Sequence, residues 1–473
     1  MTLPTSPADA SREAWDLIVV GGGVAGLVAA NRAAERGRRV LLLEKGEDEC
    51  YPCNTRFSGG AFHIAMNDVF APPEQLHDLV METTGGTADP ALLARLIEEA
   101  PATLRWLQSH GVRFGRVPAI NQQNVLLPLR PNRPGIQWPG RGGDVFVRQM
   151  GSWLQRQGGT LWRGATARRL IPAGSRVSGV EVGLASGTTT IVSGQRILLA
   201  DGGYQADPEL LERYVTPAPA RLQQRNAGSG NGAGLRMAVA LGAALRGMDG
   251  GFYGHLLARE ALANEALWPF PILDFLAMAG LVVDQGGRRF CDETQGGVYL
   301  ANAVARLDDP AGAHVIFDDA IWREAGAFRA IPPNPHLILA GGQMHSANSL
   351  DQLAGAIGLP PDALLATVDA YHQAWNDDTL TQLNPPRART LAMARPLRHP
   401  PFHAIPLVAG ITYTLGGIAV DADARVLRPD GTPIPGLYAA GATTGGLEGG
   451  PHSGYVGGLM KSAVFGWLAG DQA

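Results

Sequence analysis

The chain has 473 residues, of which 17% are charged, and its formal net charge is −4. This length predicts two or three domains with enough apolar material to enclose a large internal site. The small net charge argues against nucleic acid or an anionic membrane surface as a partner. No apolar run approaches the roughly 20 residues that span a bilayer, and no secretory or twin-arginine signal is visible. We therefore expect a cytoplasmic protein without a membrane span.

A βαβ unit near the N-terminus carries the first functional signal. Its strand, helix and second strand are predicted at residues 17–20, 27–36 and 40–43. The sequence Gly21-x-Gly23-x-x-Gly26 joins the first strand to the helix, and Glu44 ends the second strand. Such glycines let the backbone approach a pyrophosphate, while the acidic residue accepts hydrogen bonds from ribose hydroxyls. The unit therefore predicts a parallel α/β sheet that binds a dinucleotide.

Two later strands, predicted at residues 196–200 and 436–440, also end in glycine-containing loops. These returns of the chain to the cofactor favour FAD over NAD, because a simple NAD enzyme does not need them. Between the two strands, residues 248–411 are richer in Pro and Trp, contain short helical patterns such as 351–375, and lack a Gly-rich phosphate loop. This interval is a candidate inserted domain.

Seven segments spread over nearly the whole chain carry a family resemblance. They are WDLIVVGGGVAGLVAA, NTRFSGGAF, LLADGGY, GSGNGAGLRMA, GLVVDQGGRRFCDE, TYTLGGIAVD and GLYAAGATTGG. Together they resemble the FAD-dependent oxidoreductases that include soluble fumarate reductases, succinate dehydrogenase flavoproteins, ketosteroid dehydrogenases and tricarballylate dehydrogenases. The resemblance implies an α/β fold: a Rossmann-like FAD-binding domain with a discontinuous parallel sheet (residues 1–247 and 412–473) and an inserted α+β substrate-capping domain (residues 248–411).

The fingerprint and the resemblance together nominate residues that hold FAD, which is expected to be non-covalent. They are Gly21, Gly23, Val24, Ala25, Gly26, Glu44, Lys45, Asn54, Thr55, Ser58, Gly59, Gly60, Ala200, Asp201, Gly202, Gly203, Asn231, Gly232, Gly441 and Gly457. We interpret Cys50 and Cys53 as reduced packing residues, since they lack the further ligands of a metal site, and no metal is predicted. The alternative is that Cys53 contacts or tethers the flavin, because succinate dehydrogenase flavoproteins carry their covalent histidine in this neighbourhood.

Several polar residues of a fumarate reductase are replaced in this chain. By resemblance, Tyr413 stands where the family has a histidine, Tyr299 lies near the place of a cap-domain arginine, and the arginine of the C-terminal substrate loop falls near His452. The resulting candidate catalytic residues are His255, Tyr299, Tyr413, His452 and Tyr455. Tyrosines in these places resemble the ketosteroid dehydrogenase branch, in which a tyrosine removes the proton α to a ketone.

The predicted function is an FAD-dependent dehydrogenase, or desaturase, that oxidises a C–C bond α,β to a carbonyl in a small cyclic ketone or keto acid. A tyrosine would abstract the α-proton, and flavin N5 would accept the hydride. The alternative is a fumarate-reductase-like reductase of an α,β-unsaturated carboxylate, and a third reading is a non-catalytic flavoprotein. No haem motif, iron–sulfur spacing or second nucleotide fingerprint is visible, so we expect a separate electron acceptor.

Further side chains are candidates for the substrate site. A tyrosine base with an ordinary pKa near ~10 needs a neighbouring charge or donor, for which the candidates are His255, His452, Arg288 and Arg289. Aromatic walls for a cyclic substrate could come from Trp138, Phe252, Tyr253, Trp268 and Phe270. Arginines that could bind a substrate carboxylate are Arg130, Arg133 and Arg141.

Overall fold

A parallel sheet forms the centre of the first domain in the computed structural model, which describes residues 14–117, 122–129, 133–135, 137–328, 331–388 and 394–473. In spatial order its five parallel strands are β18 (Pro433–Ala439), β8 (Thr189–Leu199), β1 (Trp15–Val20), β2 (Val40–Leu43) and β5 (Thr160–Trp162). Every residue of β2 is buried, as expected for a parallel strand covered on both faces. The sequence predicted β1, β2, the end of β8 and β18 from their buried apolar runs, whereas β5, whose three residues are half-buried, was not predicted.

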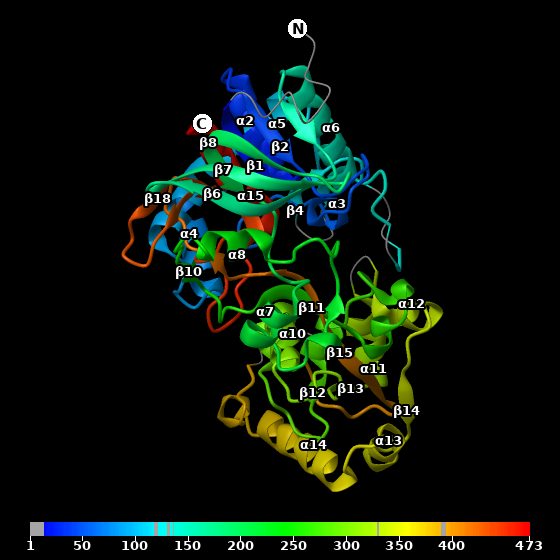
Figure 1. Ribbon diagram of the computed structural model, residues 1–473. Coiled ribbons are helices and arrows are strands. Elements are labelled where there is room, and N and C mark those ends of the chain that lie inside the picture. The colour runs from blue at the N-terminus through cyan, green and yellow to red at the C-terminus, as the bar shows by residue number, and fades with distance from the viewer. Residues whose placement is uncertain (1–13, 118–121, 130–132, 136, 329–330, 389–393) are drawn as a thin grey trace.

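Antiparallel strands extend the parallel sheet on one side. The strands β6 (Ala165–Ala173) and β7 (Arg176–Leu184) form a meander that leads into β8, and β17 (Arg425–Leu427) lies antiparallel to β18. A separate hairpin joins β3 (Phe114–Val117) to β4 (Gln122–Leu126). Figure 1 shows the meander in teal across the front of the parallel strands.

Helices pack around this sheet, and the C-terminal helix contacts the first one. The helices of this domain are α2 (Val24–Glu35), α3 (Asn54–Phe57), α4 (Pro73–Thr83), α5 (Pro90–Ser109), α6 (Gly142–Arg156), α8 (Ala233–Val239) and α15 (Gly458–Asp471). A Cβ atom on Gly466 would lie 2.3 Å from the carbonyl oxygen of Ala25, and one on Gly470 would lie 2.4 Å from that of Ala29. Glycine at both positions lets α15 approach α2 backbone to backbone, which joins the two ends of the chain.

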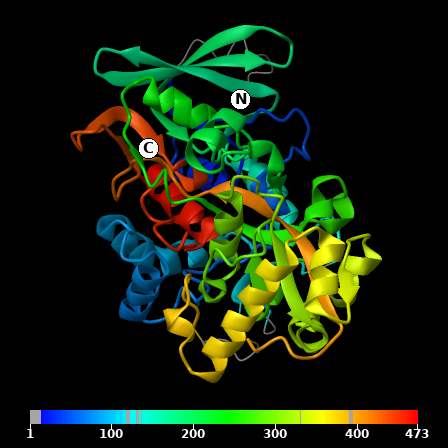
Figure 2. The same cartoon turned by 90° about the horizontal axis from the view of Figure 1, so that it is seen from below.

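The second domain is built on an antiparallel sheet whose long strand is β15 (Phe402–Thr414). The sheet has the order β11 (Phe252–Ala258), β15, β13 (His314–Asp318), β12 (Leu281–Val283), with β14 (His345–Ala347) and β9 (Gln223–Gln224) also paired to β15. Its helices are α7 (Pro208–Tyr214), α9 (Asp274–Ala279), α10 (Gly297–Ala305), α11 (Asp319–Glu324), α12 (Pro333–Leu339), α13 (Leu350–Ile357) and α14 (Pro361–Asn376). In Figure 2, viewed from the side of this domain, α13 and α14 lie nearest the reader in yellow.

A short two-stranded ladder joins the domains. The chain leaves the first domain through β10 (Leu245–Arg246) and returns through β16 (Gly417–Ile418), and these strands pair with each other. The predicted boundary at residue 411 falls within β15, which continues to Thr414. In addition, β9 precedes the predicted cap and yet pairs with β15, so the cap-domain sheet draws residues from both sides of the predicted interval.

Candidate active site

The Gly-rich loop after β1 is shaped by backbone contacts. A Cβ atom on Gly26 would lie 2.0 Å from the carbonyl oxygen of Gly21, so the loop can turn tightly into α2 only with glycine at this position. By contrast, the nearest atom to a Cβ on Gly23 would be the hydroxyl oxygen of Thr55, at 3.5 Å. The start of α2, whose positive dipole end attracts phosphate, therefore has room for a close ligand.

Glu44 lies beside this loop, as the fingerprint predicts. Its carboxylate accepts hydrogen bonds from the backbone N–H groups of Gly22 and Gly46, both at 2.8 Å. Burial raises the pKa of Glu44, while these two N–H donors act in the opposite direction. The carboxylate is thus fixed beside the Gly-rich loop, where the fingerprint predicts a partner for the ribose.

Asp201, at the end of β8, provides an independent test of whether these residues fit a dinucleotide. Its Oδ2 atom accepts from the N–H of Gly234 at 2.7 Å, whereas its Oδ1 atom is buried and has no hydrogen-bond partner. Burial raises the pKa of Asp201 to about 6. An unpartnered buried carboxylate oxygen costs free energy, and a sugar or ribityl hydroxyl would satisfy it. The residues present therefore fit FAD.

The segment from Asn54 to Gly60 links three parts of the chain. The amide of Asn54 donates to the carbonyl of Thr412 at 2.9 Å, and its oxygen accepts from the N–H of Ala227 at 3.0 Å. Thr55 accepts from the N–H of Val24 at 3.0 Å, so this segment also touches the start of α2. Both polar ends of Asn54 thus connect protein segments around the expected flavin position.

The other predicted cofactor residues lie on α2 and in several connections between elements. Lys45 donates to the carbonyl of Ser229 at 2.5 Å, which ties the end of β2 to the loop before α8. The N–H of Gly232 donates to the carbonyl of Gly203 at 3.2 Å. The residues concerned are Ala25, Ser58, Gly59, Ala200, Gly202, Asn231, Gly441 and Gly457, in addition to those just described. Of these residues, Ala200 and Gly202 follow β8 and Gly441 follows β18, at the sheet edge where open parallel sheets bind ligands, whereas Ser58 and Gly59 follow α3, Asn231 precedes α8 and Gly457 precedes α15.

Three tyrosines form a ring cluster between the two domains. Tyr253 on β11 stacks on Tyr455, with ring centroids 3.8 Å apart, and lies 5.7 Å from Tyr413 on β15. Tyr413 and Tyr455 approach edge to face at 6.3 Å. Burial raises the pKa of all three tyrosines. Two of the predicted catalytic residues thus meet here, together with Tyr253, which the sequence nominated only as an aromatic wall.

His255 joins this cluster through a hydrogen-bonded chain. Its Nε2 atom lies 3.1 Å from the hydroxyl of Tyr253, and its Nδ1 atom lies 2.6 Å from a carboxylate oxygen of Asp274. The second oxygen of Asp274 accepts from the N–H of Leu256 at 2.9 Å. Asp274 therefore fixes the orientation of the imidazole, and the imidazole in turn contacts the tyrosine hydroxyl.

Arg225 places a positive charge against the same cluster. Its guanidinium donates to the carbonyl of Pro269 at 3.1 Å and to the hydroxyl of Thr412 at 3.0 Å, and lies 5.5 Å from the ring centre of Phe270. Within the described residues its third nitrogen makes no hydrogen bond and no carboxylate lies within ion-pair distance. Burial lowers the pKa of Arg225, whereas the charges of Tyr253 and Asp274 oppose that shift. This half-buried cation can bind a carbonyl or carboxylate oxygen.

A buried ion pair lies behind Tyr413. The hydroxyl of Tyr413 donates to both carboxylate oxygens of Glu448, at 2.9 and 3.1 Å. Lys461 donates to the same carboxylate at 2.5 Å, and the side chains of Glu448 and Lys461 are 0% and 2% exposed. His63, whose ring meets Tyr455 edge to face at 5.3 Å, is also buried. Burial lowers the pKa of His63 to about 4, so its ring is neutral at pH 7.

The remaining catalytic candidates lie elsewhere. Tyr299 on α10 is half-buried near Cys291 and Asp292, and makes none of the ring contacts described for the tyrosine cluster. His452 packs against Gly85 in the turn after α4. The structure therefore brings together His255, Tyr413 and Tyr455, but not Tyr299.

The predicted arginines and aromatic walls do not all lie at one site. Arg133 and Arg141 line a pocket with Phe57, Trp138 and Phe270, whereas Arg130 lies outside the described residues. Of the other proposed walls, Phe252 and Trp268 are buried in the hydrophobic core. Arg289 forms an ion pair with Glu293, and Arg288 is exposed.

The three cysteines are free thiols. Cys50 is exposed, whereas Cys53 is buried and burial raises the pKa of its thiol to about 11. A thiol in this state is a poor nucleophile. The burial of Cys53 thus favours its interpretation as a packing residue.

Arg225, Asp274, Glu448, Lys461 and His63 were not predicted. None of them lies inside a motif used in the sequence analysis, although His63 and Glu448 each lie within two residues of one, and they become neighbours only when β11, β15 and α15 meet. The local sequence around two of them could have indicated a buried ion pair. Lys461 lies in an apolar segment and Glu448 in a Gly-rich one, where an unpaired buried charge would be costly.

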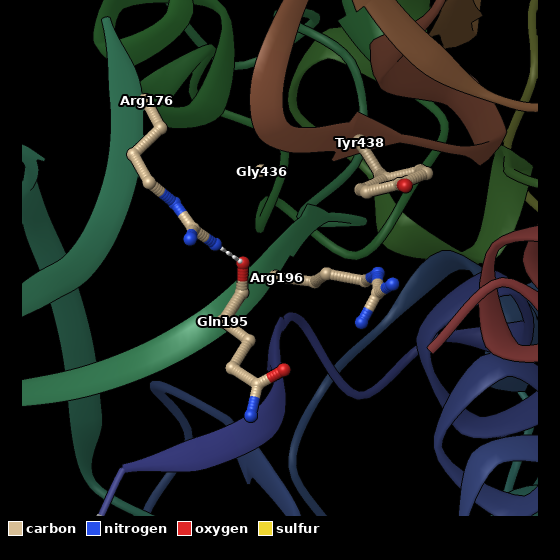
Figure 3. A pocket seen from close by; sticks show the side chains of 5 residues that line it. All are labelled: Arg176, Gln195, Arg196, Gly436 and Tyr438. Carbon is tan, nitrogen blue, oxygen red and sulfur yellow. Dashed lines mark hydrogen bonds between the residues drawn. The ribbon is translucent and has the colours of Figure 1, made fainter.

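One groove lies away from this site. A cavity of about 300 Å³ on the surface of β7, β8 and β18 is lined by Arg176, Gln195, Arg196, Gly436 and Tyr438, and Figure 3 shows the hydrogen bond of 2.6 Å from Arg176 to the carbonyl of Gln195. None of these residues was predicted to bind a ligand.

Fold and site together define a flavoprotein oxidoreductase in which a two-part dinucleotide-binding domain is covered by an inserted domain. The chain belongs to the FAD binding domain family, whose pattern it matches over residues 16–454. FAD is its cofactor. Among the described residues, no helix combines the length and the apolarity needed to cross a membrane.

Several characterised proteins are similar to this chain. It is 27% identical to an NADH:fumarate oxidoreductase of Klebsiella pneumoniae, covering 98% of this chain and 48% of that protein, so it spans about half of that relative's length. It is 26% identical to the 4-oxocyclohexanecarboxylate 2-dehydrogenase of Sinomonas cyclohexanicum, covering 97% of this chain and 92% of that protein. The structure of a 3-ketosteroid delta1-dehydrogenase from Sterolibacterium denitrificans superposes with a TM-score of 0.75 at 20% identity, covering 97% and 99% of the two chains. The last comparison shows a shared fold.

Proposed function

We propose that this chain is a dehydrogenase that oxidises a C–C bond α,β to the carbonyl of a small cyclic ketone or keto acid. The observation that carries the proposal is the cluster of three tyrosines beside one half-buried guanidinium that pairs with no carboxylate among the described residues. Such a site offers hydroxyl groups for proton transfer and one cationic donor for a carbonyl or carboxylate oxygen.

The alternative, reduction of an unsaturated dicarboxylate, needs more positive charge. A clamp for two carboxylates requires several cationic donors at the substrate. In the described part of the chain, Arg56 pairs with Asp144, while Arg289 and Arg387 pair with Glu293. Among the described residues Arg225 is the arginine beside the tyrosines, while Arg133 and Arg141 line a separate pocket with Trp138, so a substrate with one anionic or strongly accepting group fits the tyrosine cluster better.

The residues of the cluster have separate roles in this proposal. Bound FAD supplies the acceptor for the hydride that leaves the β-carbon. A tyrosine hydroxyl takes the proton from the α-carbon, and Arg225 stabilises the negative charge that develops on the carbonyl oxygen. Asp274 and His255 keep the hydroxyl of Tyr253 in place.

The similarity to the 4-oxocyclohexanecarboxylate 2-dehydrogenase supports a cyclic keto acid as the substrate class. That compound has one ketone and one carboxylate, and Arg225 could bind either group. We further propose that FAD is bound without a covalent link and that electrons leave to a separate acceptor, since the sequence contains no second redox motif.

Anaerobic titration of the holoenzyme tests the function. We expect 4-oxocyclohexanecarboxylate or cyclohexanone to bleach the flavin absorbance, and succinate to leave it unchanged. Replacing Tyr253, Tyr413 or Tyr455 by Phe should slow the bleaching, whereas Tyr438→Phe, on the outer groove, is the matched control with the wild-type rate. If no ketone bleaches the flavin, and an α,β-unsaturated acid instead reoxidises the dithionite-reduced enzyme, the chain is a reductase.

A further inference from the structure

Glu448 is a buried carboxylate to which the proposed reaction assigns no role. Four groups donate to it: the hydroxyl of Tyr413, the ammonium of Lys461, and the backbone N–H groups of Val456 and Gly457, at 3.0 and 3.2 Å. Its side chain is 0% exposed, so water does not compete for these donors. The carboxylate is thus paired with Lys461 and hydrogen-bonded to the hydroxyl of a tyrosine in the substrate cluster.

This contact fixes the direction of the Tyr413 hydrogen bond. A phenol has one proton, and in Tyr413 that proton points to Glu448. The hydroxyl of Tyr413 cannot at the same time donate to a substrate carbonyl. Its remaining lone pairs face away from Glu448, so toward a substrate Tyr413 can act only as an acceptor of a hydrogen bond or of a proton.

We propose that Tyr413 and Glu448 form a proton relay, in which Tyr413 takes the α-proton of the substrate as it passes its own proton to Glu448. This inference rests on the proposed dehydrogenase function. The Cα–H bond breaks, its electron pair enters the enolate, and its proton forms a new O–H bond on Tyr413. The former Tyr413 proton forms an O–H bond on Glu448, which becomes a neutral acid beside Lys461. Glu448 acts only through Tyr413 and is therefore a positioning and proton-holding residue.

The electrostatics of the cluster favour such a relay over a free tyrosinate. Burial and the charge of Glu448 raise the pKa of Tyr413 well above its ordinary value, so a tyrosinate at this position does not form at neutral pH. In the relay no tyrosinate is needed, because the phenol loses one proton as it gains another. The other titratable groups facing Glu448 are Tyr253, Tyr455, His63 and Lys461, of which Lys461 alone bonds to it through its side chain.

A double-mutant cycle separates the relay from a merely structural role of Glu448. The variants are Tyr413→Phe, Glu448→Gln and both together, and the measurement is the anaerobic rate of flavin reduction by 4-oxocyclohexanecarboxylate. If the two residues act as one unit, each single change lowers the rate of flavin reduction about 100-fold. The rate of the double variant should then lie within about 2-fold of the rates of the single variants. Deuterium at the α-positions of the substrate should slow the single variants at least as strongly as the wild type.

Two outcomes would overturn the relay. The first is a double variant whose loss equals the product of the single losses, because Glu448 then acts independently of Tyr413. The second is a Tyr413→Phe variant that keeps the wild-type rate. In either case ketones still bleach the wild-type flavin, so the dehydrogenase function stands. Failure of every ketone to bleach the wild-type enzyme instead rejects the function, and the relay with it.

Folding of the variants needs its own control, since Glu448→Gln leaves Lys461 without its partner. The pair Glu448→Gln with Lys461→Met removes both charges, and FAD content per protein shows whether it assembles. The cycle is then repeated with this neutral pair in place of Glu448→Gln. The relay predicts that the neutral pair also lowers the rate of flavin reduction about 100-fold. In the Tyr413→Phe background the neutral pair should cause no further loss. A wild-type rate in the neutral pair would reject the relay.

Discussion

The two sides of the active site are built from different parts of the polypeptide. On the cofactor side, backbone N–H groups and glycines shape the loops, as at Gly26 and Gly22, and backbone N–H groups hold the carboxylates of Glu44 and Asp201. On the substrate side, buried side chains carry the function: Arg225, Glu448 and Lys461 place three charges around the tyrosines. The first side therefore depends on steric fit within a short segment, and the second on charge balance between distant segments.

The largest expected effect is at Gly26. Gly26→Ala puts a Cβ atom 2.0 Å from the carbonyl oxygen of Gly21, so β1 and α2 must move apart. We expect loss of bound FAD and a decrease in the free energy of unfolding of at least about 4 kcal/mol. The measurements are the FAD content of the purified protein and urea denaturation.

Gly355→Ala is the matched control for this prediction. Gly355 also lies in a helix, α13 of the second domain, and a Cβ there would meet nothing within 4 Å. The same substitution should keep FAD and raise the free energy of unfolding by about 0.5–1 kcal/mol. Equal behaviour of the two alanine variants would show that backbone contact does not shape the cofactor loop.

On the substrate side, we expect loss of charge compensation, rather than a steric clash, to destabilise the protein. Lys461→Met removes the ammonium that compensates Glu448 and leaves a fully buried carboxylate without its cation. We expect a decrease of about 3 kcal/mol in the free energy of unfolding, and a recovery of most of this loss when Glu448→Gln is added. Urea denaturation of the single and double variants measures both. Equal stability of Lys461→Met and the wild type would mean that this buried pair contributes little.

This contrast explains how much of the molecule could be predicted. The parallel sheet and the dinucleotide loop follow from local spacing, because the buried runs at β1 and β2 and the three glycines between them lie within about thirty residues. Tyr413, Tyr455 and His255 were nominated by family resemblance rather than by a physical pattern. Tyr299 was nominated in the same way, and the structure places it near Cys291 and Asp292 instead.

The charges around the tyrosines could not be predicted in this way. Arg225 and Asp274 come from segments 49 positions apart and meet through β11 and β9 on either edge of β15. Glu448 and Lys461 face Tyr413 only because α15 starts beside the end of β15. Their roles depend on tertiary contacts, which the spacing of residues in one segment does not encode.

Arg225 should affect ligand binding more than stability. Arg225→Met removes the cation nearest the tyrosines, and we expect the Kd of a carboxylate ligand, benzoate, to rise about 30-fold, equivalent to about 2 kcal/mol. FAD content should not change. Perturbation of the flavin spectrum by benzoate measures the Kd. The matched control is Arg213→Met, since Arg213 also lies over an aromatic ring, that of Tyr214, but is exposed. The same Kd in Arg225→Met and the wild type would remove Arg225 from the binding site.

The smallest effect that we expect is the contribution of His63 to the pH dependence of the free energy of unfolding. Burial lowers its pKa to about 4 in the folded protein, below the ordinary value of 6.5, so between these values the unfolded chain binds the proton and the folded chain does not. The stabilisation is therefore present above pH 6.5 and is lost as the pH falls toward 4. Between pH 7.5 and 5.5 the wild type should lose about 1 kcal/mol more in free energy of unfolding than His63→Asn, whose amide oxygen can still accept from the N–H of Met66. His77→Asn, at an exposed position of α4, should keep the pH dependence of the wild type. If His63→Asn also shows the pH dependence of the wild type, burial does not hold the imidazole beside Tyr455 neutral. The charge balance of the substrate side then does not include His63.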